Sequence, residues 1–410
     1  MNDTIEIFLA ILQAALRKEQ PQIRREIPTA QWQALFHMAA IHKVLPLVYE
    51  AVYTLPAIAT EQALLTAVKQ DMRRQVILQT MRTGEFLELY DRLQKAGVEP
   101  LVVKGIVCRS LYPQPDHRPS SDEDVLIRAE QFEICHRVFT EFGMATETQD
   151  DAYEIPYRKP GSPLYIELHK SLFPPESDAY GDMNRFFANA RQRACTLEIQ
   201  GRTVCTLGHT DHLFYLICHA FKHFLHSGFG IRQVCDIVLY ANTYGSQVDW
   251  AQVLANCQAI RAEKFAAAVF AIGKNYLVFD PVRAAYPESW QAIRVDEVPM
   301  LFDLLSGGLY GDASMSRKHS SNITLDAVAA QKQGRKAKNA FVSSVFPSAA
   351  KLENRYPYLK KHRYLLPLAW CSRLWSYGRE TRSARGNNAA DALKIGSARI
   401  ELMKMYGILD

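Results

Sequence analysis

The sequence lacks several features that would identify a common kind of binding site or a cellular address. Its eight cysteines are scattered singly and no two form a Cys-x-x-Cys pair, which argues against a zinc knuckle and against a disulfide framework. No apolar run approaches the roughly 18 residues needed to cross a bilayer, and we find no internal repeat. The first helix-like stretch begins with Asp3 and Glu6 instead of a basic region. We therefore expect no signal peptide and a place in the reducing cytoplasm.

What the chain does contain is typical of a globular protein with an uneven charge. Its 410 residues are 48% hydrophobic and 22% charged, and this length can form two or three cores. Residues 317–385, called here the basic segment, carry 15 lysines and arginines against three acidic residues, a net charge of +12, while the rest carries −7. The basic segment is a solvated face, a surface for a polyanion such as RNA, or a cover that folds back over the acidic body.

The hydrophobic pattern divides the chain into three parts. Residues 1–96 show helical spacing, residues 97–208 alternate between strand and helix patterns, and residues 209–410 return to helical spacing. We expect the fold class α+β, with a small mixed sheet between large N- and C-terminal helical regions. The expected strands and hairpin lie at residues 100–103, 124–127, 152–158, 162–173 and 196–207.

The stretch HRPSSDEDVLIR, residues 117–128, places three acidic residues at the start of a buried strand. Because residues two apart share one face of a strand, Asp122 and Asp124 point the same way and Glu123 points oppositely. Two carboxylates on one face repel each other unless a cation lies between them, and Mg²⁺ or Mn²⁺ suits such a site. Glu167, in the strand LYIELH, is a third carboxylate that is a candidate metal ligand or general base. The alternative is a solvated acidic loop before the strand.

Three residues are candidates for contact with phosphate groups. Lys104 and Gly105 end one strand and open a helix, so backbone N–H groups there can meet an anion, and Lys104 adds a positive charge. Arg118, four residues before Asp122, can offer a forked pair of donors to phosphate oxygens. The alternative for Lys104 and Arg118 is an ordinary place on the surface.

The histidines of the third part could form a metal site of another kind. A phosphohydrolase of the His-Asp type needs an adjacent His-Asp pair, but residues 211–212 read Asp-His, and no glutamate lies between His219 and His223 as a zincin requires. We expect either ordinary helix packing or a polar brace that faces the active site. The residues of this brace would be His169, His219, His223, Arg232 and Asp236.

Three motifs resemble one known superfamily. The stretches LVVKGIVCRSLYP, RPSSDEDVLI and YIELHKSL resemble the DNA polymerase β type nucleotidyltransferases, and most of all the uncharacterised bacterial nucleotidyltransferase family, over about residues 98–240. By this resemblance, Gly105 is the turn glycine of the superfamily's Gly-Ser signature, Asp122 and Asp124 are the paired metal ligands, and Glu167 is the third acidic residue. The chain departs from the signature because Lys-Gly-Ile replaces Gly-Ser.

The resemblance implies a nucleotidyltransferase core at residues 97–208 and metal-dependent transfer of a nucleoside monophosphate from an NTP to an acceptor. Lys104 and Arg118 would hold the phosphates, and Glu167 would position a metal or take the acceptor proton. The acceptor stays open among small molecules, sugars, peptides, proteins and RNA. Two alternatives remain: a catalytically silent nucleotide sensor, which the missing serine favours, and an enzyme of the same fold that transfers another phosphate-linked group.

Overall fold

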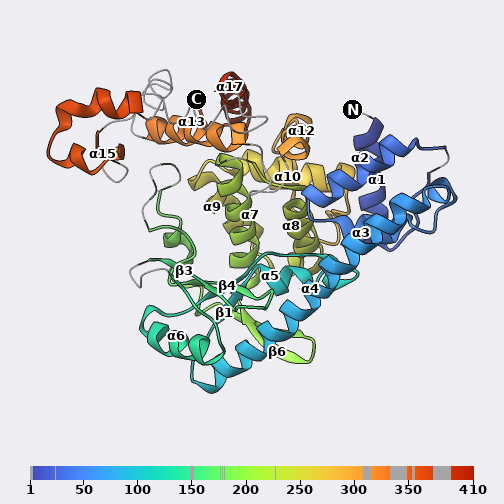
Figure 1. Ribbon diagram of the computed structural model, residues 1–410, viewed down its shortest axis with the longest axis horizontal. Helices are drawn as coiled ribbons and strands as arrows, with labels where there is room; N and C mark the ends of the chain where they lie inside the picture. The colour runs from blue at the N-terminus through green and yellow to red at the C-terminus, as the bar shows by residue number, and fades with distance from the viewer. Residues whose placement is uncertain are drawn as a thin grey trace.

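The computed structural model places a six-stranded sheet beneath a layer of upright helices (Figure 1). It describes residues 3–23, 25–147, 152–175, 177, 179, 181–226, 228–307, 315–332, 349–352, 356–372 and 389–410. The strands are β1 (Leu101–Val103), β2 (Glu123–Leu126), β3 (Glu154–Arg158), β4 (Tyr165–His169), β5 (Cys195–Ile199) and β6 (Arg202–Thr206). The helices that precede or interrupt the sheet are α1 (Asp3–Arg17), α2 (Thr29–Ile41), α3 (Leu45–Val52), α4 (Gln62–Lys95), α5 (Gly105–Arg109) and α6 (Phe132–Glu141).

The sheet is mixed and has the order β3-β4-β2-β1-β6-β5. β2 runs parallel to β4 and antiparallel to β1, and β3 closes the edge antiparallel to β4. The hairpin of β5 and β6 turns at Gln200 and Gly201, which both have positive φ angles, as a two-residue hairpin loop requires. All the strands that the sequence predicts are therefore confirmed, and β2 starts one residue earlier than expected.

Alternate residues of β2 face opposite layers of the molecule. Glu123 points toward α4 and α5, since it bonds to Arg109, while Asp124 points toward α7, since both it and His219 lie close to Nζ of Lys104. On the Glu123 face, Phe139 of α6 packs edge-on against Tyr157 of β3. The face of Glu123 is thus covered by α5 and α6, and the face of Asp124 is directed toward α7.

The helices after the sheet form the upper layer. They are α7 (His209–Leu225), α8 (Ile231–Tyr244), α9 (Trp250–Ala259), α10 (Glu263–Tyr276), α11 (Glu288–Gln291), α12 (Val298–Gly307), α13 (Met315–Lys332), α15 (Ala349–Leu352) and α17 (Ala389–Met405). α7 and α8 rise from the sheet toward α13 and α17 (Figure 1). One continuous hydrophobic core joins the N-terminal helices, the sheet and these helices. The fold class α+β is confirmed, whereas the domain boundaries after residues 96 and 208 stay a prediction.

Of the basic segment, residues 317–332, 349–352 and 356–372 are described. In its described part, Thr324 of α13 donates a hydrogen bond to the carbonyl of Leu225 at the end of α7, so α13 covers that helix end. Leu352, Leu359 and Ala369 form a small hydrophobic cluster of their own, separate from the main core. The prediction that the basic segment walls the cleft falls in part on residues 333–348, 353–355 and 373–385, outside those described, and it stays a prediction.

Two expectations about the whole chain can be checked against the structure. The eight cysteines are all free thiols, as their scattered positions predict. None of the helices that the structure describes combines the length and hydrophobicity needed to cross a bilayer.

Candidate active site on the carboxylate face of the sheet

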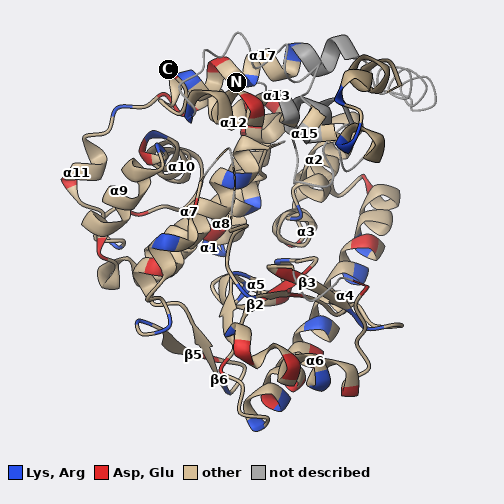
Figure 2. Cartoon of the chain, turned by 90° about the vertical axis from the view of Figure 1, so that its left-hand side faces the viewer, with Lys and Arg blue, Asp and Glu red and all other residues tan. Residues whose placement is uncertain are grey.

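The register of three adjacent strands gathers acidic side chains on one face. Asp124 of β2 lies beside Glu167 of β4, and Glu154 of β3 lies opposite His169 of β4. Glu167 and His169 are two residues apart in one strand, so all four side chains share a face. Acidic and basic positions meet where α5, β2 and β3 come together (Figure 2). The alternation that the sequence shows thus brings Asp124 and Glu167 together.

Three of these side chains converge closely enough to hold one metal ion. One ligand atom from each of Asp124, Glu167 and His169, called here the carboxylate–histidine cluster, lies within 4.8 Å of the others. Nε2 of His169 is 3.3 Å from Oδ1 of Asp124 and 3.9 Å from Oε2 of Glu167. Carboxylate oxygens and imidazole nitrogen are the donors that divalent metals take in proteins. The residues present therefore fit a divalent metal.

The pKa values of the two carboxylates are pushed apart. Burial first, and then the charges of Asp124 and Asp122, raise the pKa of Glu167 to about 9. Burial also acts to raise the pKa of Asp124, but the ammonium of Lys104 and the imidazole of His169 outweigh it and hold that pKa well below its usual value. The two carboxylates therefore differ in charge at neutral pH, with Asp124 ionised beside Lys104 and Glu167 protonated.

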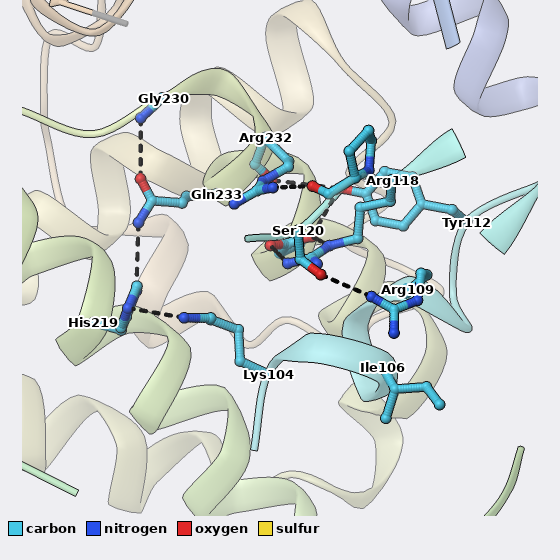
Figure 3. A network of polar contacts seen from close by, with 12 residues as sticks. Lys104, Ile106, Arg109, Tyr112, Arg118, Ser120, His219, Gly230, Arg232 and Gln233 are labelled. Atoms are coloured by element: carbon cyan, nitrogen blue, oxygen red, sulfur yellow. Dashed lines mark hydrogen bonds and ion pairs between the residues drawn. The ribbon is translucent and has the colours of Figure 1, made fainter. Parts of the chain in front are cut away.

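Lys104 is the cation that already faces this cluster. Its Nζ lies 3.0 Å from Oδ2 of Asp124 and 3.2 Å from Nε2 of His219, a contact drawn in Figure 3. Its backbone N–H donates to Nε2 of His212, and its φ of +60° turns the chain sharply from β1 into α5. Burial acts to lower the pKa of Lys104, but Asp124 and Asp122 outweigh it and hold that pKa well above its usual value. Lys104 therefore stays charged.

Gly105 is required by a close approach of Glu123. A Cβ at this position would collide with the carboxylate of Glu123, whose Oε2 accepts the backbone N–H of Ile106 at 2.8 Å. The other oxygen of Glu123 accepts from Nη2 of Arg109 at 2.6 Å. The start of α5 thus holds the protein's own carboxylate. Two of the backbone donors that we expected to meet phosphate, at Lys104 and Ile106, bond to His212 and Glu123 instead.

Arg118 and Asp236 form a buried brace beneath the acidic loop. Nε and Nη2 of Arg118 donate to the two oxygens of Asp236 at 2.8 and 2.6 Å, and the hydroxyl of Tyr112 donates to the same carboxylate at 2.8 Å. Arg118 is 1% exposed. The expectation that Arg118 offers its guanidinium to a phosphate does not fit this arrangement, because its charge is paired and its side chain is covered by protein.

The segment that leads into Asp122 is held by elements from both helical regions. Gln79 accepts the backbone N–H of Ser120 at 2.8 Å, and Arg82 donates to the carbonyl of Ser120. From the other side, Arg232 donates to the carbonyl of Pro119. Asp122 itself is partly exposed and makes no hydrogen bond or ion pair within the part of the chain that the structure describes. The backbone before Asp122 is thus held by hydrogen bonds, while the carboxylate of Asp122 can still bind a ligand.

Two of the five residues expected to form a brace, His219 and His223, lie next to Lys104, while Arg232 and Asp236 contact Pro119 and Arg118 instead. Nε2 of His219 lies 3.3 Å from Nε2 of His223, and Nδ1 of His219 lies 3.4 Å from Nε2 of Gln233, which in turn accepts the N–H of Gly230 through its Oε1 (Figure 3). Burial, reinforced by Lys104, keeps the pKa of His219 well below its usual value and lowers that of His223 to about 3. Both imidazoles are therefore neutral at pH 7.

Sequence reasoning missed three residues of this region. Gln79 and Arg82 lie in the middle of α4, and nothing in their spacing indicates that they contact a loop 38 to 41 positions away. Lys222 lies one turn after His219 on α7 and is half-buried. Burial lowers the pKa of Lys222, and the nearby carboxylate of Glu154 opposes that shift. Lys222 forms no ion pair with any described residue, which leaves its ammonium available beside the cluster.

The chain matches one family model and aligns at low similarity with two solved structures. A family model described as uncharacterised nucleotidyltransferase matches residues 28–277. No curated protein matches the chain. Among solved structures, the antibiotic-resistance factor ANT(2'')-Ia aligns at 14% identity and a TM-score of 0.34, covering 46% of this chain and 95% of its own. An antigenic nucleotidyltransferase-like protein from Paracoccidioides brasiliensis aligns at 13% identity and a TM-score of 0.31, covering 49% and 95%. Neither structural alignment is close enough to carry an argument about this chain.

Proposed function

Because the chain belongs to the uncharacterised nucleotidyltransferase family, we propose that it transfers a nucleoside monophosphate from an NTP to an acceptor with the help of a divalent metal. The observation that carries this proposal is the carboxylate–histidine cluster of Asp124, Glu167 and His169, whose ligand atoms lie within 4.8 Å of one another. Asp122 precedes β2 and is not one of the three converging ligands, but its charge acts on Glu167, so we assign it to the nucleotide side of the site. The family membership supports the reaction class, and the cluster supports this location for the site.

In this proposal, Asp124 and Glu167 hold the metal, and Asp122 faces the nucleotide side. A divalent metal held there would neutralise the charge that develops on the leaving pyrophosphate. The raised pKa of Glu167 follows from its burial and its carboxylate neighbours, so a cation among them allows Glu167 to ionise. Glu167 then holds a metal or takes the proton of the acceptor hydroxyl, the two roles that its position permits.

Two lysines are the proposed phosphate contacts. Nζ of Lys104 lies 3.0 Å from Asp124, so with Asp124 engaged as a metal ligand the ammonium of Lys104 would be free to contact the triphosphate. Lys222 approaches the same space from α7 and has no described partner to give up. Ammonium groups stabilise phosphate charge best when they are fixed in advance and shielded from water. Arg118 has a different role in this proposal: with Asp236 it holds the loop that carries Asp122.

A catalytically silent nucleotide sensor is the second candidate, and one observation favours it. Lys104 already neutralises Asp124 without a metal, and the backbone N–H groups of Lys104 and Ile106 are bonded internally. A pocket of this kind could bind a nucleotide and stop there.

Incubation with each NTP, labelled at the α-phosphate, in Mg²⁺ or Mn²⁺ separates the two candidates. A transferase releases pyrophosphate and moves label to an acceptor supplied from a small-molecule, protein or RNA fraction. A sensor binds the NTP in calorimetry but releases no pyrophosphate with any fraction. Glu130→Gln, which changes an exposed acid away from the cluster, is the matched control for any variant of Asp124.

A further inference from the structure

His169 occupies an unusual place for a structural histidine. It is the last residue of β4, is 4% exposed, and directs Nε2 at Oδ1 of Asp124, 3.3 Å away. Glu167 Oε2 lies 3.9 Å from the same nitrogen. Strand geometry explains this convergence, because His169 follows Glu167 by two residues and Glu167 lies beside Asp124 in the parallel register. Nε2 of His169 therefore lies close to the carboxylates of both Asp124 and Glu167.

The second nitrogen of the ring faces a carboxylate on the neighbouring strand. Glu154 pairs with His169 in the antiparallel register of β3 and β4, and its Oε2 lies 3.9 Å from Nδ1. Histidines that bind metals in proteins generally present one nitrogen to the metal and have the other oriented by a carboxylate or carbonyl group. Nδ1 of His169 is buried and has no hydrogen-bond partner among the described residues, and Glu154 is the carboxylate that lies nearest to it among the recorded ion pairs, on the face where the carboxylates gather.

A purely electrostatic role for His169 has less support. An imidazolium would balance the charge of Asp124, but Lys104 already does so from 3.0 Å at the other carboxylate oxygen. A neutral imidazole adds a ligand atom to the cluster without adding a second positive charge beside Lys104. The arrangement is thus better suited to binding a cation than to replacing one.

We propose that His169 is a direct metal ligand and that it makes this site prefer Mn²⁺ to Mg²⁺. This inference rests on the proposed function, because it concerns the metal of the same site. Mg²⁺ is bound almost entirely through oxygen and retains its waters, whereas imidazole nitrogen is a good ligand for transition metals. A site of two carboxylates and one imidazole therefore gains more with Mn²⁺ than a site of carboxylates alone.

Metal titrations without nucleotide test the proposal. Mn²⁺ binding is followed by the loss of the free-ion electron paramagnetic resonance signal, and Mg²⁺ binding by competition. Wild-type protein should bind Mn²⁺ at least about tenfold more tightly than Mg²⁺. His169→Gln should weaken Mn²⁺ binding about 10- to 100-fold and Mg²⁺ binding by less than about threefold. Glu154→Gln should weaken Mn²⁺ binding by a smaller factor, and His169→Asp should restore metal binding with a shift toward Mg²⁺.

Controls make each outcome decisive. His37→Gln, at an exposed position of α2, should leave both affinities unchanged, and thermal melting must show that His169→Gln and His169→Asp fold. Equal losses for both metals in His169→Gln, or no loss for either, would overturn the proposal. The transfer assay separates the two hypotheses. Selective loss of Mn²⁺ binding in a protein that consumes no NTP refutes the transferase alone, whereas transfer with unaltered metal preference in His169→Gln refutes the ligand role alone.

Discussion

Two buried ion pairs flank the acidic loop, and they differ in almost every other respect. Arg118 grips Asp236 with two hydrogen bonds, and Tyr112 donates a third to the same carboxylate. Lys104 approaches Asp124 through one contact, on a face that also carries Glu167 and other acids. In the first pair Asp236 accepts three hydrogen bonds and has no second carboxylate recorded beside it in the described part of the chain, whereas in the second pair Asp124 lies beside the carboxylate of Glu167. A buried charge pair alone therefore does not indicate an active site; an excess of like charge around it does.

The largest effect is expected when Asp124, the central carboxylate of the cluster, is replaced. Asp124→Asn should reduce nucleotidyl transfer by a factor on the order of 10⁴, about 5.4 kcal/mol in the activation free energy, because it deletes a proposed metal ligand. Folding should be retained, since Glu167 loses a like-charged neighbour and can ionise to balance Lys104. Rates and urea unfolding curves of Asp124→Asn and Glu130→Gln check this. An active Asp124→Asn protein would refute the site.

For the pair of Arg118 and Asp236 we expect a loss of stability and no direct loss of catalysis. Asp236→Asn leaves the buried guanidinium of Arg118 without its counter-charge and should lower the free energy of unfolding by about 3–5 kcal/mol. Any loss of transfer should follow the loss of folded protein and should recover at low temperature or with a stabilising osmolyte. Urea unfolding of Asp236→Asn measures the effect. A stable Asp236→Asn protein with normal unfolding but greatly weakened NTP affinity would mean that Arg118 does contact phosphate.

Lys222 tests whether the face that carries Asp124 binds the phosphates of the nucleotide. Lys222→Ala should weaken NTP affinity about 10- to 100-fold, or roughly 1.5–3 kcal/mol, because it removes one charge-assisted contact. Nucleoside affinity should be unchanged, and Lys222→Arg should retain most of the NTP affinity. Calorimetry on these variants, with exposed Lys69→Ala of α4 as control, measures both. Equal losses for NTP and nucleoside would place Lys222 away from the phosphates.

The smallest effect is a pH dependence of stability in the metal-free protein. The pKa of Glu167 is raised to about 9, so between about pH 4.5 and pH 9 the folded state retains a proton that the unfolded state releases. Stability from this group therefore falls as pH rises through that window. Wild-type protein in chelator should lose more of its Tm between pH 5.5 and pH 8.5 than Glu167→Gln, and added Mn²⁺ should remove the difference. Parallel Tm curves for the two proteins would show that Glu167 is an ordinary exposed acid.

The sequence predicts the elements that create the cluster, but not the partners that support it. The two-residue period of a strand places Asp122 opposite to Glu123, and the flanking apolar residues locate β2 and β4. Both are local properties. The pairing of Arg118 with Asp236 spans 118 positions and depends on how α8 packs. That packing is a tertiary property that the sequence pattern does not reveal. Its position four residues before Asp122 predicts Arg118 as a phosphate contact instead.

The partners of Glu123 also depend on tertiary packing that the sequence pattern does not predict. The alternation predicts that it faces away from Asp124, and the structure places it there, but its bonds to Ile106 and Arg109 require the exact approach of α5 to β2. Gly105 follows from that approach, since only a residue without Cβ fits. A motif match indicates the glycine by resemblance, whereas the structure gives its physical cause.

Anomalous X-ray scattering from Mn²⁺ tests the central claim most directly. Crystals of the full chain grown with Mn²⁺ and a non-hydrolysable NTP analogue should show an anomalous difference peak among Asp124, Glu167 and His169, with the phosphates directed toward Lys104 and Lys222. A nucleotide bound elsewhere, with no Mn²⁺ peak at these three residues, would contradict the account.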